Sequence, residues 1–130
     1  THRVQIPATR ACLVGPTTKG KMIPLPPFRA DEALDNPQLA NAAIHYGLTS
    51  NEARLYVDTK GTGPVITVCN GEKCPPPSGF AFVTWSPSLD GPFYCIEPWM
   101  GPSNSTEHQV GLHQVPSGHR SSYVISVKLS

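Results

Sequence analysis

A glutamate in an apolar setting is the residue of this sequence whose type and position best suit acid–base chemistry. Glu97 lies within FYCIEPWMGPSN, residues 93–104, directly between Ile96 and Pro98. Burial among apolar groups disfavours the charged form of a carboxyl group and raises its pKa unless a partner compensates. A base tuned in this way suits proton abstraction from a weak acid, so Glu97 is a candidate catalytic base. The structural alternative is a partly exposed glutamate that pairs with a backbone amide.

The segment around Glu97 is expected to form a β-strand over residues 93–99, with alternate side chains on opposite faces. The face of Glu97 would also carry Phe93, Cys95 and Trp99, and the other face would carry Tyr94 and Ile96. Pro98 interrupts regular strand pairing, and the Gly-Pro pair that follows Met100 turns the chain. A carboxylate at a strand end that opens onto a loop is well placed for a functional site.

Cysteines and one asparagine are the next candidates for chemistry. Cys69 and Cys74 flank the short loop of CNGEKC, so a disulfide between them is one prediction and two reduced thiols the other. Cys12 and Cys95 lie in apolar runs and are expected to behave as small buried side chains. Asn104 begins an N-x-S/T triplet and is a candidate glycosylation site. A disulfide and a glycan would together favour a secreted over a cytoplasmic protein.

The elements that must position these residues are predicted to be short strands. The chain has 15 prolines and 11 glycines, a spacing that long helices do not tolerate. Strand-like segments separated by turn residues cover 3–7, 12–14, 53–58, 65–69, 80–86, 93–99 and 121–129. Residues 22–29 favour an extended edge segment, and residues 31–43, divided by Pro37, are the one helix-like stretch. This pattern predicts an all-β protein, an antiparallel β-sandwich.

Composition limits the choice of partners. The 130 residues suit a single domain over residues 1–130 with one core. The net charge is +1 and the basic residues are scattered, which argues against a nucleic-acid or anionic-membrane partner. The sequence contains no run of eighteen apolar residues, so no membrane-spanning helix is predicted. The spacing of His108, His113 and His119 fits no standard metal-ligand pattern, so no metal site is predicted.

The motif CIEPWMGPSN, residues 95–104, resembles the C-terminal signature of the aldose 1-epimerase (galactose mutarotase-like) superfamily. Other segments resemble the family less specifically: THRVQIPA, PLPPFR, IHYGL with ARLYVD, SGFAFVTWSPSLDGPFYCIEPW, and GLHQVPSGHRSSYVISVKL. The resemblance therefore covers nearly the whole chain, and CIEPW is its specific motif. It implies that the sandwich is the C-terminal portion of the family's larger supersandwich.

The resemblance also implies an activity, the interconversion of the α and β anomers of a free neutral aldose such as galactose or glucose. Glu97 matches the family's catalytic base, and no metal or cofactor is required. Trp99 is expected to stack on the apolar face of the sugar, with core packing as the alternative. His45 is a candidate for contact with a sugar hydroxyl, with a structural role as the alternative.

Two departures from the family pattern motivate a second hypothesis. The family's acid histidine lies upstream of the first matched segment, so its counterpart is not among these residues. The position of the family's sugar-binding aspartate falls near Ala43, where this sequence has no aspartate. A non-catalytic carbohydrate-binding protein, lectin-like or a secreted defence protein, is therefore the alternative function. Half of a large sandwich would leave strand edges uncovered, so either a missing N-terminal half or a homodimer is expected to cover them.

Overall fold

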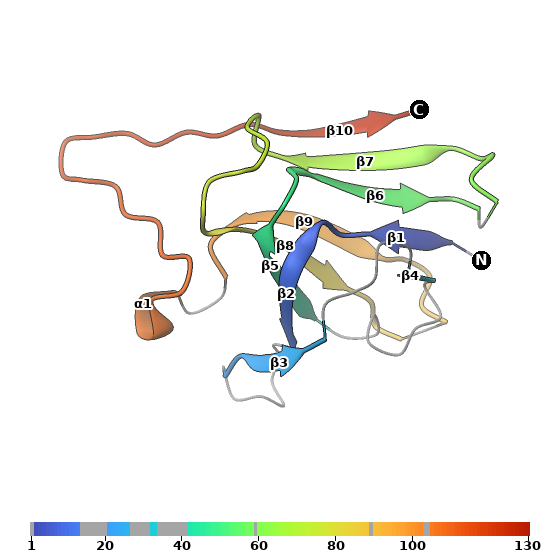
Figure 1. Cartoon of the computed structure of the whole chain (residues 1–130), viewed down its shortest axis with the longest axis horizontal. Helices are drawn as coiled ribbons and strands as arrows, with labels where there is room; N and C mark the ends of the chain where they lie inside the picture. Colours follow the sequence, from blue (N-terminus) through green and yellow to red (C-terminus); the bar gives the residue numbers. More distant parts are fainter. Residues whose placement is uncertain are drawn as a thin grey trace.

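Two antiparallel sheets of five strands pack face to face in this computed structural model (Figure 1). The structure describes residues 2–13, 21–26, 32–33, 42–58, 60–88, 90–102 and 105–130. Sheet A has the strand order β10-β7-β6-β1-β4, and sheet B has the order β3-β2-β5-β8-β9. The predicted all-β antiparallel sandwich is confirmed.

The strands are short, as the frequent turn residues predict. Sheet A contains β1 (Arg3–Gln5), β4 (Glu32–Ala33), β6 (Glu52–Tyr56), β7 (Val65–Asn70) and β10 (Ile125–Leu129). Sheet B contains β2 (Ala8–Leu13), β3 (Ile23–Leu25), β5 (Ala43–Leu48), β8 (Phe80–Trp85) and β9 (Cys95–Met100). One short helix, α1 (Ser105–His108), follows β9. Among the described residues, no helix is long and apolar enough to cross a membrane.

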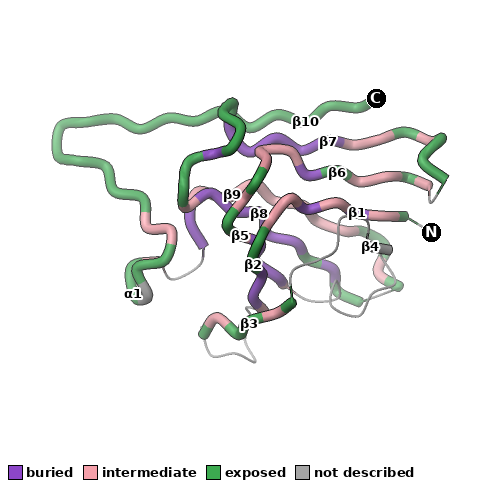
Figure 2. The backbone as a smooth tube through the Cα atoms, in the orientation of Figure 1, coloured by how far each residue is buried: buried purple, intermediate pink, exposed green. Residues whose placement is uncertain are grey.

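The main core lies between the two sheets. It consists of Val4, Ile6, Ala53, Val68 and Phe82, which come from both sheets. Strand alternation explains this selection, because every second side chain of an inner strand points across the sandwich. Figure 2 shows buried residues concentrated along the paired strands, whereas residues 113–130 are exposed throughout.

A second apolar cluster lies on the other face of sheet B. Its buried members are Cys12, Ile44, Ala81 and Val83, and Met22, Tyr46 and Trp99 pack against them. Ala81 and Val83 alternate along β8 with Phe82, which belongs to the core between the sheets. Sheet B is therefore apolar on both faces, and its outer face is the one that carries Glu97.

Asn70 ties the two sheets together at one end of the sandwich. This residue is fully buried at the end of β7, and its Nδ2 donates to the carbonyl oxygens of Ala81 at 2.7 Å and Trp99 at 3.0 Å. A single amide group from sheet A thus bonds the backbones of β8 and β9 in sheet B. These bonds fix the end of β9 that carries Trp99.

Several boundaries differ from the sequence predictions. The stretch 31–43 is not helical where it is described: Glu32–Ala33 forms β4, Ala43 begins β5, and residues 31 and 34–41 lie outside the described residues. β9 begins at Cys95, and β10 begins at Ile125 rather than near residue 121. β2 covers Ala8–Leu13 and so begins earlier than the predicted strand at residues 12–14, whereas β1 ends at Gln5, before the predicted end at residue 7.

Candidate functional site

Glu97 lies in the middle of β9, directly opposite Val83 of β8. The predicted division of this strand into two faces is confirmed. Tyr94 and Ile96 pack against the core between the sheets, whereas Trp99 packs against the outer cluster. The carboxylate of Glu97 therefore belongs to the outer face of sheet B, at the edge strand of that sheet.

Trp99 holds the carboxylate in place. Its indole Nε1 donates a hydrogen bond of 3.0 Å to Oε2 of Glu97, and both side chains are partly buried. The two residues are two positions apart on one strand, which places their side chains on the same face. An indole can only donate, so it orients the carboxylate as an acceptor. Oε1 accepts no hydrogen bond from any described residue, which leaves this oxygen for a ligand.

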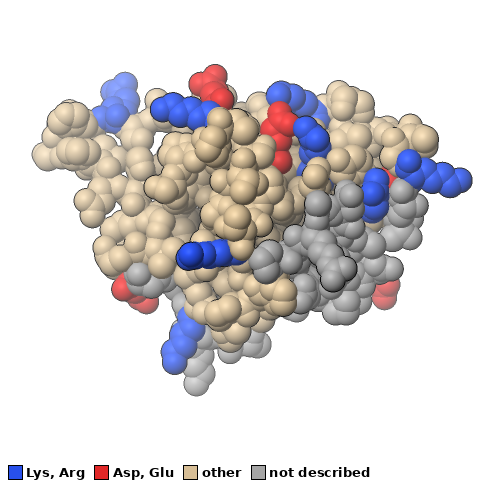
Figure 3. Space-filling view, viewed as in Figure 1, with Lys and Arg blue, Asp and Glu red and all other residues tan. Residues whose placement is uncertain are grey.

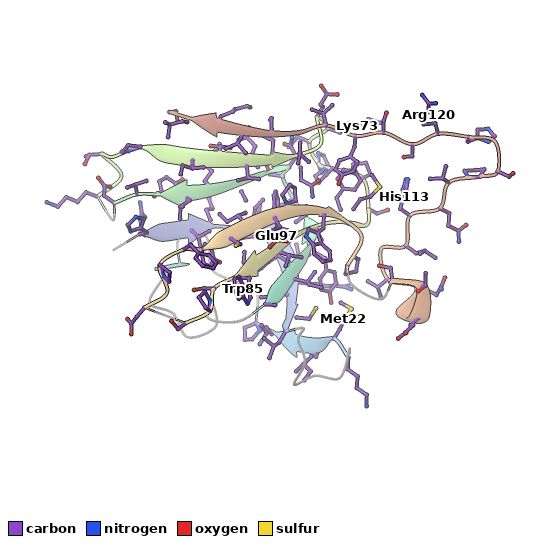
Figure 4. The ribbon with its side chains drawn as sticks, turned by 180° about the vertical axis from the view of Figure 1, so that it is seen from behind. Met22, Lys73, Trp85, Glu97, His113 and Arg120 are labelled. Carbon is purple, nitrogen blue, oxygen red and sulfur yellow. The ribbon has the colours of Figure 1, made fainter. Side chains whose placement is uncertain are left out.

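Trp85 is the site residue that sequence reasoning missed. It pairs with Cys95 at the end of the β8–β9 hairpin, so its indole shares the face of Glu97. The residue is 38% exposed, and its ring centroid lies 5.4 Å from that of Phe93, with the planes tilted by 45°. Figure 4 shows Trp85 and Glu97 on neighbouring strands, where the register places them at diagonal positions. The alternation in FAFVTW and the turn between the two strands could have indicated this pairing.

His45 does not join Glu97, which corrects its prediction as a sugar-contacting residue. Ile44 belongs to the outer cluster, so the next side chain along β5 points into the sandwich. His45 is 1% exposed, and its Nε2 lies 2.8 Å from Oγ1 of Thr84. Burial lowers the pKa of His45 to about 4, so the ring is neutral at physiological pH. Its role in the structure is that of a buried polar partner for Thr84.

His113, in the C-terminal segment, also lies away from Glu97. His113 lines a cleft of about 220 Å³ beside Phe80, Met100 and Tyr123, and its Nε2 lies 2.9 Å from Oγ of Ser121. Figure 4 shows His113 on the segment that leads to β10, well separated from Glu97. Of the histidine side chains in the described ranges, none makes a hydrogen bond to the Glu97 carboxylate.

The predicted disulfide is not formed, because Cys69 and Cys74 are free thiols in the structure. Cys69 is buried in β7 with its Sγ 4.0 Å from Oε1 of Glu52, and Cys74 is exposed with its Sγ 3.9 Å from Oγ of Ser50. Asn104, the candidate glycosylation site, lies outside the described residues. Burial raises the pKa of the Cys12 thiol to about 11, which makes it a poor nucleophile.

Charged side chains do not gather into a single patch on the face shown in Figure 3, where basic and acidic residues are interspersed. The sheet A surface shows the same mixture: Glu52 accepts a hydrogen bond of 2.9 Å from Arg54 and lies 3.5 Å from Nζ of Lys128. Within the described ranges, no cluster of three or more His, Cys, Asp or Glu side chains is arranged to hold a metal ion.

Comparisons with known proteins give no match: no protein-family model fits the chain, and no curated protein or solved structure is significantly similar to it. The relationship to the aldose 1-epimerase superfamily is therefore a proposal based on sequence motifs. The geometry adds a hydrogen bond from the partly buried Trp99 to Glu97, on the same face of sheet B as the exposed Trp85.

Proposed function

We propose that this chain provides the base-bearing part of an aldose 1-epimerase-like protein that acts on neutral aldoses such as galactose or glucose. One observation carries the proposal: Trp99 fixes one oxygen of the Glu97 carboxylate, on a face that also presents the exposed ring of Trp85. Aromatic rings pack well against the apolar C–H face of a sugar ring, and a carboxylate accepts bonds from its hydroxyls. The resemblance of CIEPW to the family motif assigns the same glutamate.

The proposed reaction begins when Oε1 of Glu97 accepts the proton of the anomeric hydroxyl. The electron pair left on that oxygen forms the carbonyl as the bond between C1 and the ring oxygen breaks, and an acid protonates the ring oxygen. Rotation about the bond between C1 and C2 presents the other face of the aldehyde, and the reverse steps close the ring. The hydrogen bond from Trp99 orients the carboxylate through Oε2, and Oε1 is the oxygen that accepts no hydrogen bond from a described residue.

The acid is the part of this reaction that the described residues do not supply. His45 is neutral inside the sandwich, and His113 lies in a separate cleft. This observation favours the second candidate function, a carbohydrate-binding protein without turnover on the same face of sheet B. The two functions share the sugar-binding surface and differ in whether an acid completes the site.

Polarimetry of freshly dissolved α-D-glucose and α-D-galactose tests the proposal. The protein should speed the approach to anomeric equilibrium, and Glu97→Gln should reduce the catalysed rate by roughly 10²–10⁴-fold, the usual contribution of a general base. Glutamine keeps an oxygen that can accept the Trp99 hydrogen bond, so the fold should persist. Glu107→Gln, the same change at an exposed glutamate of α1, is the matched control and should retain the wild-type rate.

A rate equal to that of buffer alone would refute the epimerase proposal for this chain. Calorimetric titration with the same sugars would then separate the remaining possibilities. Binding that is weakened by Trp85→Ala and kept by Glu107→Gln would support the carbohydrate-binding function. No binding by the wild-type protein would refute both functions.

A further inference from the structure

β10 forms an edge of sheet A and is exposed on all sides except where it pairs with β7. All five residues from Ile125 to Leu129 are exposed, and β7 is the one neighbour of β10 in the strand order. Figure 1 shows β10 along the outer margin of the molecule, with no described element beyond it. Figure 2 shows the same strand exposed along its whole length. This edge is open to another strand.

The backbone of β10 alternates between groups that bond β7 and groups that point away. Ser130 and Val65 exchange two hydrogen bonds, of 2.8 and 3.0 Å, and Gly71 N–H donates to the carbonyl oxygen of Val124 at 3.0 Å. In an antiparallel ladder such bonded positions recur at every second residue. Positions 124, 126, 128 and 130 therefore face β7. The N–H and C=O groups of Ile125, Val127 and Leu129 point to the open edge.

The same three residues carry the apolar side chains of the strand. Val127 pairs with the core residue Val68, so its side chain lies on the inner face of sheet A. Sheet B does not cover this part of that face, because Ile125, Val127 and Leu129 are 55%, 70% and 75% exposed. Open backbone groups and uncovered apolar side chains thus coincide at three alternate positions.

Two of the other sheet edges carry a proline that blocks strand addition. β10 carries no proline, and Lys128 is its one charged side chain, a protection that edge strands also use. Proline lacks an N–H group, and Pro24 interrupts β3 while Pro98 interrupts β9. β4, the remaining edge, is described over two residues, Glu32 and Ala33. Proline and very short strands are the usual protection of sheet edges against pairing with other chains. β10 has neither a proline nor a bulge in its pairing with β7.

We propose that β10 pairs antiparallel with β10 of a second copy of this chain, about a two-fold axis that passes beside Val127. In this register Val127 lies opposite Val127 of the second copy, and Ile125 lies opposite Leu129. Each of these positions has its N–H and C=O turned outward, so every open group of the strand gains a partner. Sheet A then continues from one copy into the next, and the apolar side chains of both strands lie on one face.

Charge also favours this register. Lys128 lies on the opposite face of the strand and is 3.5 Å from Glu52 of its own chain. Pairing about Val127 sets Lys128 opposite Ser126 of the second copy, whereas pairing about Lys128 would set two ammonium groups opposite each other.

A strand of five residues buries less than the roughly 1,000 Å² expected of a stable interface. The dimer should therefore be weak and dependent on concentration.

Sedimentation and amide hydrogen exchange, each over a range of protein concentrations, test the proposal independently of any sugar chemistry. The apparent mass should rise towards that of a dimer with concentration. The amides of Ile125, Val127 and Leu129 should become protected over the same range. The amides of Ser126 and Lys128 bond β7, so they serve as internal controls and should be protected at every concentration.

Val127→Pro removes one outward N–H group without removing a bond to β7, so the fold should persist, as protection of the Ser126 and Lys128 amides would show. This variant should weaken association by about tenfold or more, the effect of losing one or two net hydrogen bonds. Val127→Ala keeps the N–H group and should associate more strongly than the proline variant.

Three results would overturn the proposal. The first is a monomer at all concentrations with unprotected outward amides. The second is a set of outward amides protected equally at all concentrations, which would mean that another part of the chain covers the edge. The third is a dimer that the folded proline variant retains, which would place the interface elsewhere.

Discussion

Protonation of His45 should make the stability of the fold depend on pH between about 4 and 6.5. Burial lowers the pKa of this imidazole from 6.5 to about 4, because the charged form would lose its hydration inside the sandwich. In the unfolded chain the same ring takes up a proton below its ordinary pKa. The unfolded state therefore binds more protons than the native state in this window, and the stability falls as the pH falls.

The size of the effect follows from the two pKa values. They differ by 2.5 pH units, and each unit corresponds to about 1.36 kcal/mol, which gives a loss of about 3 kcal/mol. The contribution is fully present above pH 6.5, declines by about 1.4 kcal/mol per pH unit below it, and levels off below pH 4. A loss of this size is a large fraction of the 5–15 kcal/mol typical of a domain.

Urea denaturation at several pH values between 4 and 7.5 measures this contribution. His45→Gln keeps a polar group near Thr84 and removes the titration, so its free energy of unfolding should vary less with pH than that of the wild type. His119→Gln, at an exposed histidine, is the control and should follow the wild type. Burial raises the pKa of Tyr94 to about 12, so that neighbour of Thr84 does not titrate in this range.

Parallel pH profiles for the wild type and His45→Gln would refute the reasoning. That result would mean that the folded protein accommodates the imidazolium, and His45 would again be a candidate acid. A steeper wild-type profile would instead support its assignment as a structural residue.

Two further predictions concern the scaffold of the site and are measured by thermal and chemical denaturation. Asn70→Ala should lower stability by about 2–4 kcal/mol, because it leaves the buried carbonyl groups of Ala81 and Trp99 without their shared donor; an unchanged midpoint would contradict the link between the sheets. Gly47→Ala should destabilise by more than Gly118→Ala. Both glycines have a positive φ, but a Cβ at Gly47 would also collide with Oγ1 of Thr9, whereas Gly118 has open space; equal effects would contradict the steric argument.

Features that depend on the alternation of side chains within one strand could be predicted from the sequence. The opposite placement of Ile96 and Glu97 follows from the period of a strand, and the structure has it. The location of His45 depends on which face of β5 meets the other sheet, and the pairing of Trp85 with Cys95 depends on register across a hairpin. Those are non-local properties, which no pattern within one segment specifies. The structure has Cys69 and Cys74 as free thiols rather than the predicted disulfide, and the reason is related: a short loop does not by itself determine where its two thiols point.

The position of Glu97 limits where a catalytic acid could come from. Val83 lies opposite Glu97 on β8, and Val83, Ile44 and Cys12 form a buried apolar row that continues across sheet B. A polar group cannot reach the carboxylate through that row without losing its hydration. β9 is an edge strand, with no strand beyond it in the part of the chain that the structure describes, and Pro98 has no N–H group to bond one. If the proposed epimerisation occurs, the acid that protonates the ring oxygen should approach from the side of this edge.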